Sequence, residues 1–206
     1  DLVVCAAGGA FGPFDGQLFV GEFTDAKVSR VFLEKVGGEY QGASFPFVAG
    51  LASGVTRVLF GPDHALYVGM TSRGWSSLGT KSYGLQRVRW TGTVPFAIRA
   101  MRALPGGFEL EFTAEVEPAS AGAVASYAMK SYPYLYSSAY GSPEIEERPA
   151  RITAAEVSAD RRRVRLAVEG RRELFVHELR AAGVRSAAGE PLAHPDAYYT
   201  LNRIPR

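Results

Sequence analysis

Short apolar runs broken by Gly, Pro, Asp or Ser recur along the whole chain. Runs of this length that are rich in Val, Phe, Tyr and Leu are typical of β-strands. In the first part of the chain they predict five strands, near residues 17–22, 28–35, 56–60, 65–70 and 85–90. The segment Gly61-Pro62-Asp63-His64 has the composition of a tight turn, so the strands on either side of it are expected to form a hairpin. The pattern predicts an all-β fold.

One phrase occurs twice in this part: FGPFDGQLFVGE at 11–22 and FGPDHALYVGM at 60–70. The copies are separated by 48 residues when their Asp residues are aligned, and a Ser/Gln-Arg-Val echo follows each, at 29–31 and 86–88. A repeat near this length, built from short strands, is typical of β-propeller blades. Because blades pack against neighbours and only about two are encoded, residues 1–95 predict a partial propeller, the end of a longer array.

The pattern changes after the connector Thr91–Pro95. Apolar and charged residues alternate in Phe108–Phe112 and in Val164-Arg165-Leu166, as in strands with one solvated face. Short strands at this spacing predict an immunoglobulin-like β-sandwich over residues 96–206. An Ala-rich segment, 118–125, predicts a turn of helix, and the arginines at 161–163 are expected at a hairpin tip. Seven strands are expected, at 98–101, 108–113, 127–136, 152–157, 164–168, 175–179 and 198–201.

Composition excludes several classes of protein. The 23 Lys and Arg residues nearly balance the 21 Asp and Glu residues, so no nucleic-acid partner is expected. The single cysteine, Cys5, excludes an internal disulfide and a thiolate zinc site, and we interpret it as a small buried hydrophobe. No stretch approaches the roughly 18 apolar residues of a membrane helix, so no membrane partner is expected either.

The best candidate for a binding site is the polar insertion at 71–84, which precedes the last strand of the second copy. The first copy has a much shorter segment there, and loops of a packed scaffold can vary in this way to bind ligands. Arg73 and Lys81 supply positive charge, Trp75 an aromatic face and Tyr83 a hydroxyl group. These groups suit a sugar or an anionic cofactor.

Metal and catalytic sites are less well marked. Glu22 and Asp25 end a strand expected to line the propeller axis, so they are the predicted calcium ligands, although carboxylates in turns can also be purely structural. The histidines, His64, His177 and His194, show neither a catalytic triad nor a metal-binding pair, so catalytic residues are not identified. A dense tyrosine run could bind carbohydrate rings or supply half-buried sandwich aromatics: Tyr127, Tyr132, Tyr134, Tyr136 and Tyr140.

Four segments carry a family resemblance: GQLFVGEFTDAKVSRVFLEKVGGEYQGASFPF (16–47), GLASGVTRVLFGPDHALYVG (50–69), RGWSSLGTKSYGLQRVRWTGTVPF (73–96) and HPDAYYTLNRIP (194–205). Together they resemble the C-terminal end of large bacterial proteins related to glucose/sorbosone dehydrogenases, the soluble quinoprotein propeller family. Members that oxidise sugars carry pyrroloquinoline quinone over the propeller axis, with a histidine base from an early blade and calcium nearby. The resemblance also implies a periplasmic or secreted location.

No histidine of this chain matches the family's catalytic motif, and the early blades are not encoded. The resemblance therefore implies a C-terminal part of such a protein that holds no quinone by itself, since the cofactor needs a complete propeller, and that lacks dehydrogenase activity alone. Its expected partner is a small sugar or lactone.

Two alternatives remain open. One is a calcium-dependent hydrolase of the lactonase type, in which the metal polarises the carbonyl group; if the chain is an enzyme, this is expected before a stand-alone quinoprotein. The other is a carbohydrate-binding or interaction module.

Self-association is also expected. Two blades leave apolar faces that shield each other only in part, and such faces drive association. The sequence therefore predicts a homodimer or larger oligomer, formed by symmetric contacts within the first 95 residues. The apolar residues concerned include Leu18, Val20, Val58, Phe60, Leu66 and Val68.

Overall fold

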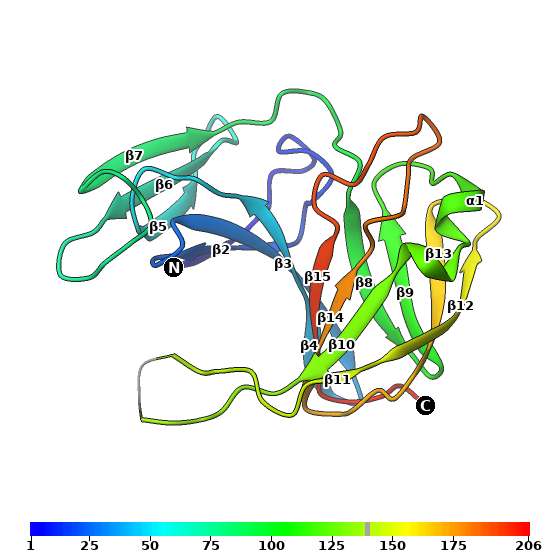
Figure 1. Cartoon of the computed structure of the whole chain (residues 1–206). Coiled ribbons are helices and arrows are strands. Elements are labelled where there is room, and N and C mark those ends of the chain that lie inside the picture. Colours follow the sequence, from blue (N-terminus) through cyan, green and yellow to red (C-terminus); the bar gives the residue numbers. More distant parts are fainter. Residues whose placement is uncertain (139–140) are drawn as a thin grey trace. The chain divides into compact units, whose positions relative to one another are not determined.

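The computed structural model describes residues 1–138 and 141–206, and almost all of its regular structure is β-strand (Figure 1). The strands form three sheets, and helical structure is confined to α1 (Pro118–Ala121) and the 3₁₀ turn η1 (Val124–Ser126). The all-β prediction is therefore confirmed. The chain divides into two compact units, one made of residues 1–32 and 44–94 and the other of residues 33–43 and 95–206.

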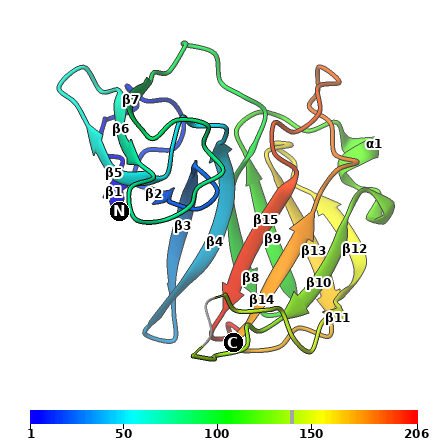
Figure 2. The same cartoon turned by 60° about the vertical axis from the view of Figure 1, so that its left-hand side comes forward.

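In the first unit, each copy of the repeated phrase belongs to a three-stranded antiparallel meander (Figure 2). The first meander is β1 (Leu2–Val4), β2 (Leu18–Glu22) and β3 (Lys27–Val36). The second is β5 (Val55–Phe60), β6 (Leu66–Thr71) and β7 (Tyr83–Val88). The expected hairpin across Gly61–His64 is present, because β5 pairs with β6 around it.

The two meanders share the same pairing register. Phe19 of β2 lies opposite Arg30 of β3, and Tyr67 of β6 lies opposite Arg87 of β7. The segments between the strands differ in length: residues 5–17 separate β1 from β2, whereas only five residues separate β5 from β6. The repeat in the sequence is thus a repeat of paired strands, and the connections vary around it.

Aromatic rings form the core of the first unit. Five phenylalanines meet with centroid separations of 4.9 to 6.2 Å, mostly edge to face, as aromatic pairs prefer. The members are Phe11, Phe14, Phe19, Phe47 and Phe60. They come from both copies of the repeat and from β4 (Glu39–Val48), so the two meanders share one core.

Arg30 is buried in this core, with only 3% of its surface exposed. Its guanidinium carbon lies 4.1 Å from the ring centroid of Phe14 and 4.3 Å from that of Phe45, and Nη1 donates a hydrogen bond of 2.7 Å to Oε1 of Gln17. Cation–π contacts and a hydrogen bond offset part of the cost of burying the charge.

In the second unit, two layers of strands pack face to face (Figure 2). One layer has the order β12 (Arg151–Val157), β13 (Arg163–Glu169), β9 (Gly107–Phe112) and β8 (Ile98–Leu104). The other is one end of an eight-stranded sheet, with the order β15 (Asp196–Leu201), β14 (Phe175–Arg180), β10 (Ala128–Tyr132) and β11 (Arg148–Pro149). The ring of Phe108 joins the layers, since its centroid lies 5.1 Å from that of Tyr199 and 5.6 Å from that of His177.

All seven strands expected in this part of the chain are present, and α1 lies in the Ala-rich segment. The arginines at 161–163 are at the tip of the β12–β13 hairpin, where Arg161 adopts a positive φ of 53°.

The second unit also includes residues 33–43, the tip of the β3–β4 hairpin, which the sequence places in the first domain. Polar contacts tie this tip to its unit. Glu34 accepts hydrogen bonds from the hydroxyl of Tyr199 and the backbone N–H of Ala103, and Oε1 of Gln41 accepts from the N–H groups of Asn202 and Arg203. These contacts join segments more than 60 residues apart, which no local pattern predicts.

Candidate functional site

The predicted binding loop follows β6 and ends where β7 begins. Its base is closed by a hydrogen bond of 2.8 Å from the N–H of Ser72 to the carbonyl of Ser82. A turn follows at once: the N–H of Trp75 donates to the carbonyl of Ser72, and Gly74 adopts a φ of +84°, a conformation that favours glycine. This turn presents Trp75 early in the loop.

The far half of the loop is fixed to the first unit by backbone contacts. The N–H of Leu78 donates to the carbonyl of Thr24 (2.7 Å), and the N–H of Lys81 donates to that of Ala52 (2.9 Å). A Cβ on Gly79 would lie 2.4 Å from the Cα of Ser53, so only glycine fits there. The loop therefore lies against the unit that carries it, although few of its own side chains are buried.

All four predicted ligand residues are exposed on this loop or at its end. Trp75 exposes 51% of its surface and Tyr83 exposes 77%. Arg73 and Lys81 are also exposed, and neither forms an ion pair within residues 1–138 and 141–206. Two aromatic faces and two uncompensated positive charges are thus accessible to a ligand on one short segment.

The predicted calcium ligands, Glu22 and Asp25, are brought together, but around an ammonium group. Nζ of Lys27 lies 3.2 Å from Oε2 of Glu22 and 2.7 Å from Oδ2 of Asp25, and the hydroxyl of Ser29 donates to Oε1 of Glu22. Burial by itself would lower the pKa of Lys27, but the two carboxylates raise it above its usual value. No cluster of three His, Cys, Asp or Glu side chains suited to a metal occurs among the described residues. A cation at this position would have to displace Lys27.

The three histidines belong to segments other than the binding loop. His64 occupies the β5–β6 turn with a φ of 57° and is exposed, and His194 is exposed in the segment before β15. His177 is fully buried. Its Nε2 accepts a hydrogen bond of 3.2 Å from the N–H of Arg172, which leaves Nδ1 to donate to the carbonyl of Phe175. Burial lowers the pKa of His177 to about 4, so this residue is neutral at pH 7 and belongs to the core.

The tyrosine run is divided between core and surface. Tyr127 and Tyr132 are buried, and their hydroxyl groups donate to the carbonyl of Ala121 and to the carboxylate of Glu178. Burial raises the pKa of both phenols. The exposed members are Tyr134 and Tyr136, while Tyr140 lies outside the described residues. The first two therefore serve as sandwich aromatics.

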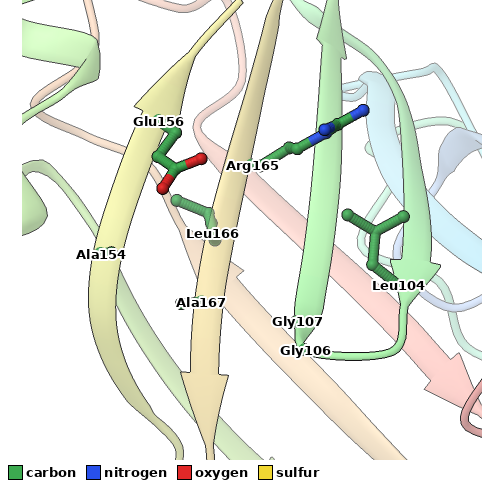
Figure 3. A pocket seen from close by; sticks show the side chains of 8 residues that line it. All are labelled: Leu104, Gly106, Gly107, Ala154, Glu156, Arg165, Leu166 and Ala167. Carbon is green, nitrogen blue, oxygen red and sulfur yellow. The ribbon is translucent and has the colours of Figure 1, made fainter.

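The sequence did not predict a shallow depression of about 160 Å³ on the solvated face of the β8–β9–β13–β12 sheet (Figure 3). It exists because residues without bulk share one row across three strands: Gly107 pairs with Ala167, which pairs with Ala154. Oε2 of Glu109 neutralises the nearby Arg165 at 2.9 Å. An adjoining depression of about 230 Å³ shares Glu156 and Arg165 with it. Charge alternation along β9 and β13 indicated the solvated face, but only the register reveals the hollow.

Cys5 is buried, as expected for a small hydrophobe, and burial raises its pKa above the usual value. Within the described part of the chain, no helix has the length and apolar character needed to cross a membrane.

Comparison of the chain with models of protein families, with curated proteins and with solved structures finds no match, so its resemblance to the glucose/sorbosone dehydrogenases rests on the four sequence segments alone.

Proposed function

We propose that this chain is a sugar-binding module whose ligand is an acidic saccharide, held by the loop from Arg73 to Tyr83. In this proposal the module consists of two propeller-type blades and an immunoglobulin-like sandwich, and it is related to the soluble quinoprotein dehydrogenases. One observation carries the proposal: this loop combines exposed aromatic rings with cations that have no ion-pair partner among the described residues.

The chemistry of these side chains suits such a ligand. The C–H face of a sugar ring packs on an indole, which offers a large, rigid apolar surface, and Trp75 is half exposed. A carboxylate on the sugar would accept charge-assisted hydrogen bonds from Arg73 and Lys81, which are stronger than neutral ones. Tyr83 adds a hydroxyl group that can donate or accept.

The backbone of the loop supports binding as well. Its hydrogen bonds to Thr24 and Ala52 hold it in place before any ligand arrives. A loop that is already ordered loses less conformational entropy on binding, so more of the contact energy appears as affinity.

The scaffold agrees with this proposal at the level of strand order. Two successive antiparallel meanders in one register supply three of the four strands that a propeller blade has, and two facing antiparallel layers are typical of a sandwich. The hydrolase alternative receives less support, because the carboxylates that would hold calcium are neutralised by Lys27.

Calorimetric titration with an oligoglucuronate, and with a neutral gluco-oligosaccharide of the same length, tests the proposal. We expect saturable binding of the acidic ligand that weakens as salt is added. Trp75→Ala should lower the affinity at least about tenfold, equivalent to about 1.4 kcal/mol. The matched control is Tyr40→Ala, which removes an exposed tyrosine outside the loop. Equal affinity of the wild-type chain and Trp75→Ala, or no binding of either ligand, would contradict the proposal.

A further inference from the structure

The two faces of each meander differ in character. Side chains alternate between faces along a strand, so Phe19 and Gly21 share one face of the first meander, and Tyr67 and Gly69 share the corresponding face of the second. We call this face, which carries a glycine in its middle strand, the notch face. The opposite face is the apolar face. It carries Leu2, Val4, Leu18 and Val20 in the first meander and Val58, Phe60, Leu66 and Val68 in the second.

Within one chain, the apolar face of the second meander packs on the notch face of the first. Phe60 lies 5.7 Å from Phe19 between ring centroids. A Cβ on Gly21 would lie 2.3 Å from Cγ1 of Val55 and 3.3 Å from Cγ1 of Val58. Gly21 is therefore required for the close approach of β5, and it forms the notch that receives these valines.

The notch face of the second meander has no such cover. Leu59 and Leu85, which flank the notch, expose 65% and 73% of their surfaces. A Cβ on Gly69 would meet only atoms of Arg57, a residue of the same sheet, with the nearest at 3.5 Å. A glycine inside a strand costs roughly 0.5–1 kcal/mol relative to alanine. Neither a positive φ nor a close neighbour among the described residues requires it here.

The apolar face of the first meander is correspondingly exposed. Leu2 lies opposite Val20 just as Val58 lies opposite Val68, so Leu2 and Val4 hold the positions that Val58 and Phe60 hold in the second meander. Leu2 exposes 58% of its surface and Val4 exposes 50%. The chain thus carries one exposed face of each kind, and the contact between these two kinds of face is already made once inside it.

We infer that copies of this chain associate head to tail, with the Leu2–Val4 face of one copy packed on the notch face around Gly69 of the next. Different surfaces meet in such a contact, so it can extend into a ring or a filament, unlike the symmetric pairing expected from the sequence. The occupant that fits the notch is a branched apolar side chain, as Val55 and Val58 are at Gly21, and the exposed residues of β1 supply it. Trp75 and the cations of the binding loop take no part.

Mass measurements over a wide concentration range test this inference. For the wild-type chain, light scattering should give a mass above 22.2 kDa that rises with concentration. Gly69→Val, which fills the notch, and the double variant Leu2→Lys with Val4→Lys, which charges the opposite face, should each be monomers. Mixed together, these two variants should form a one-to-one complex of twice the monomer mass, because each retains one intact face.

Controls keep the outcome decisive. Leu78→Lys places a charge on an equally exposed leucine of the binding loop and should leave the mass unchanged. If Gly69→Val fails to fold, Leu85→Lys on the exposed face replaces it in the mixing experiment. A wild-type monomer at all concentrations, or two variants that stay monomeric when mixed, would overturn the inference. Binding of the oligoglucuronate by monomeric Gly69→Val would show that sugar binding and association are separate.

Discussion

The two meanders have the same register but opposite surroundings. The cross-strand pair of an aromatic residue and an arginine is buried in the first meander, where Arg30 lies between phenylalanine rings. The equivalent pair is solvated in the second meander, where Arg87 forms an ion pair of 3.4 Å with Asp63. Equivalent positions in a repeat therefore have no fixed environment. The notch face of the first meander is covered by the second meander, by the long connection at 5–17 and by β4, whereas no described segment covers the notch face of the second.

The largest expected effect concerns the two arginines. Arg30→Ala should lower the free energy of unfolding by about 3 kcal/mol, because it leaves a cavity between two rings and removes the donor to buried Gln17. Arg87→Ala removes an exposed ion pair and should cost less than about 1 kcal/mol. Urea denaturation of both variants measures the difference. Equal costs would contradict the distinction between the two copies.

A buried histidine offers a pH test of the second unit against the first. His177 has a pKa of about 4 when folded and 6.5 when unfolded, so only the unfolded chain binds this proton between those values. The stabilisation from neutral, buried His177 is complete above pH 6.5. The free energy of unfolding falls by about 3 kcal/mol as the pH falls toward 4 and this stabilisation is lost.

The variant His177→Gln, which keeps a polar side chain, should flatten this part of the stability curve. Arg30→Ala in the first unit should leave its slope unchanged, since the guanidinium does not titrate there. A curve for His177→Gln parallel to that of the wild-type chain would show that other groups control the acid response.

The two notch glycines form a matched pair. Gly21→Val should cost about 2 kcal/mol or more, because the new side chain overlaps Val55. Gly69→Val should be neutral or slightly stabilising in dilute solution, because the space is open and valine favours a strand. Thermal melts at low protein concentration compare them. A large loss of stability in Gly69→Val would mean that the second notch is needed for folding.

The smallest effect concerns the ion pairs of Lys27. One of its partners, Glu22, holds the position in the first meander that Met70 holds in the second. Lys27→Ala removes the ammonium between Glu22 and Asp25, and should cost less than about 1 kcal/mol because the ion pairs are partly exposed. If the two carboxylates can hold calcium, this variant should bind Ca²⁺ more tightly than the wild-type chain, as measured by calorimetry. Glu22→Ala in the same background is the control and should abolish the gain.

Particular strands show where sequence-based prediction works and where it stops. Alternation of apolar and charged residues predicted β9 and β13, because each has one buried and one solvated face. β1 and β4 were not predicted. β1 has three residues, too few for a pattern, and β4 contains Gly42 and Pro46, which usually interrupt strands. Partners that are distant in sequence supply what local preference lacks.

The loop predicted to bind a ligand can be located in the sequence because it is an insertion relative to the first copy, and the structure shows that its Trp75 and Tyr83 are exposed. The environment of the predicted metal ligands could not be identified from the sequence, because the placement of Lys27 between Glu22 and Asp25 depends on the β2–β3 turn.

The sequence by itself determined the all-β fold, the repeat, its register and the position of the exposed loop, because these follow from periodicity, turn residues and the alignment of two copies. Only the tertiary structure decided that Arg30 is buried while Arg87 is solvated, that Gly21 is filled while Gly69 is open, and that small residues of three strands create a hollow. Burial depends on contacts between segments that are far apart in the sequence, and a local pattern of residues does not determine those contacts.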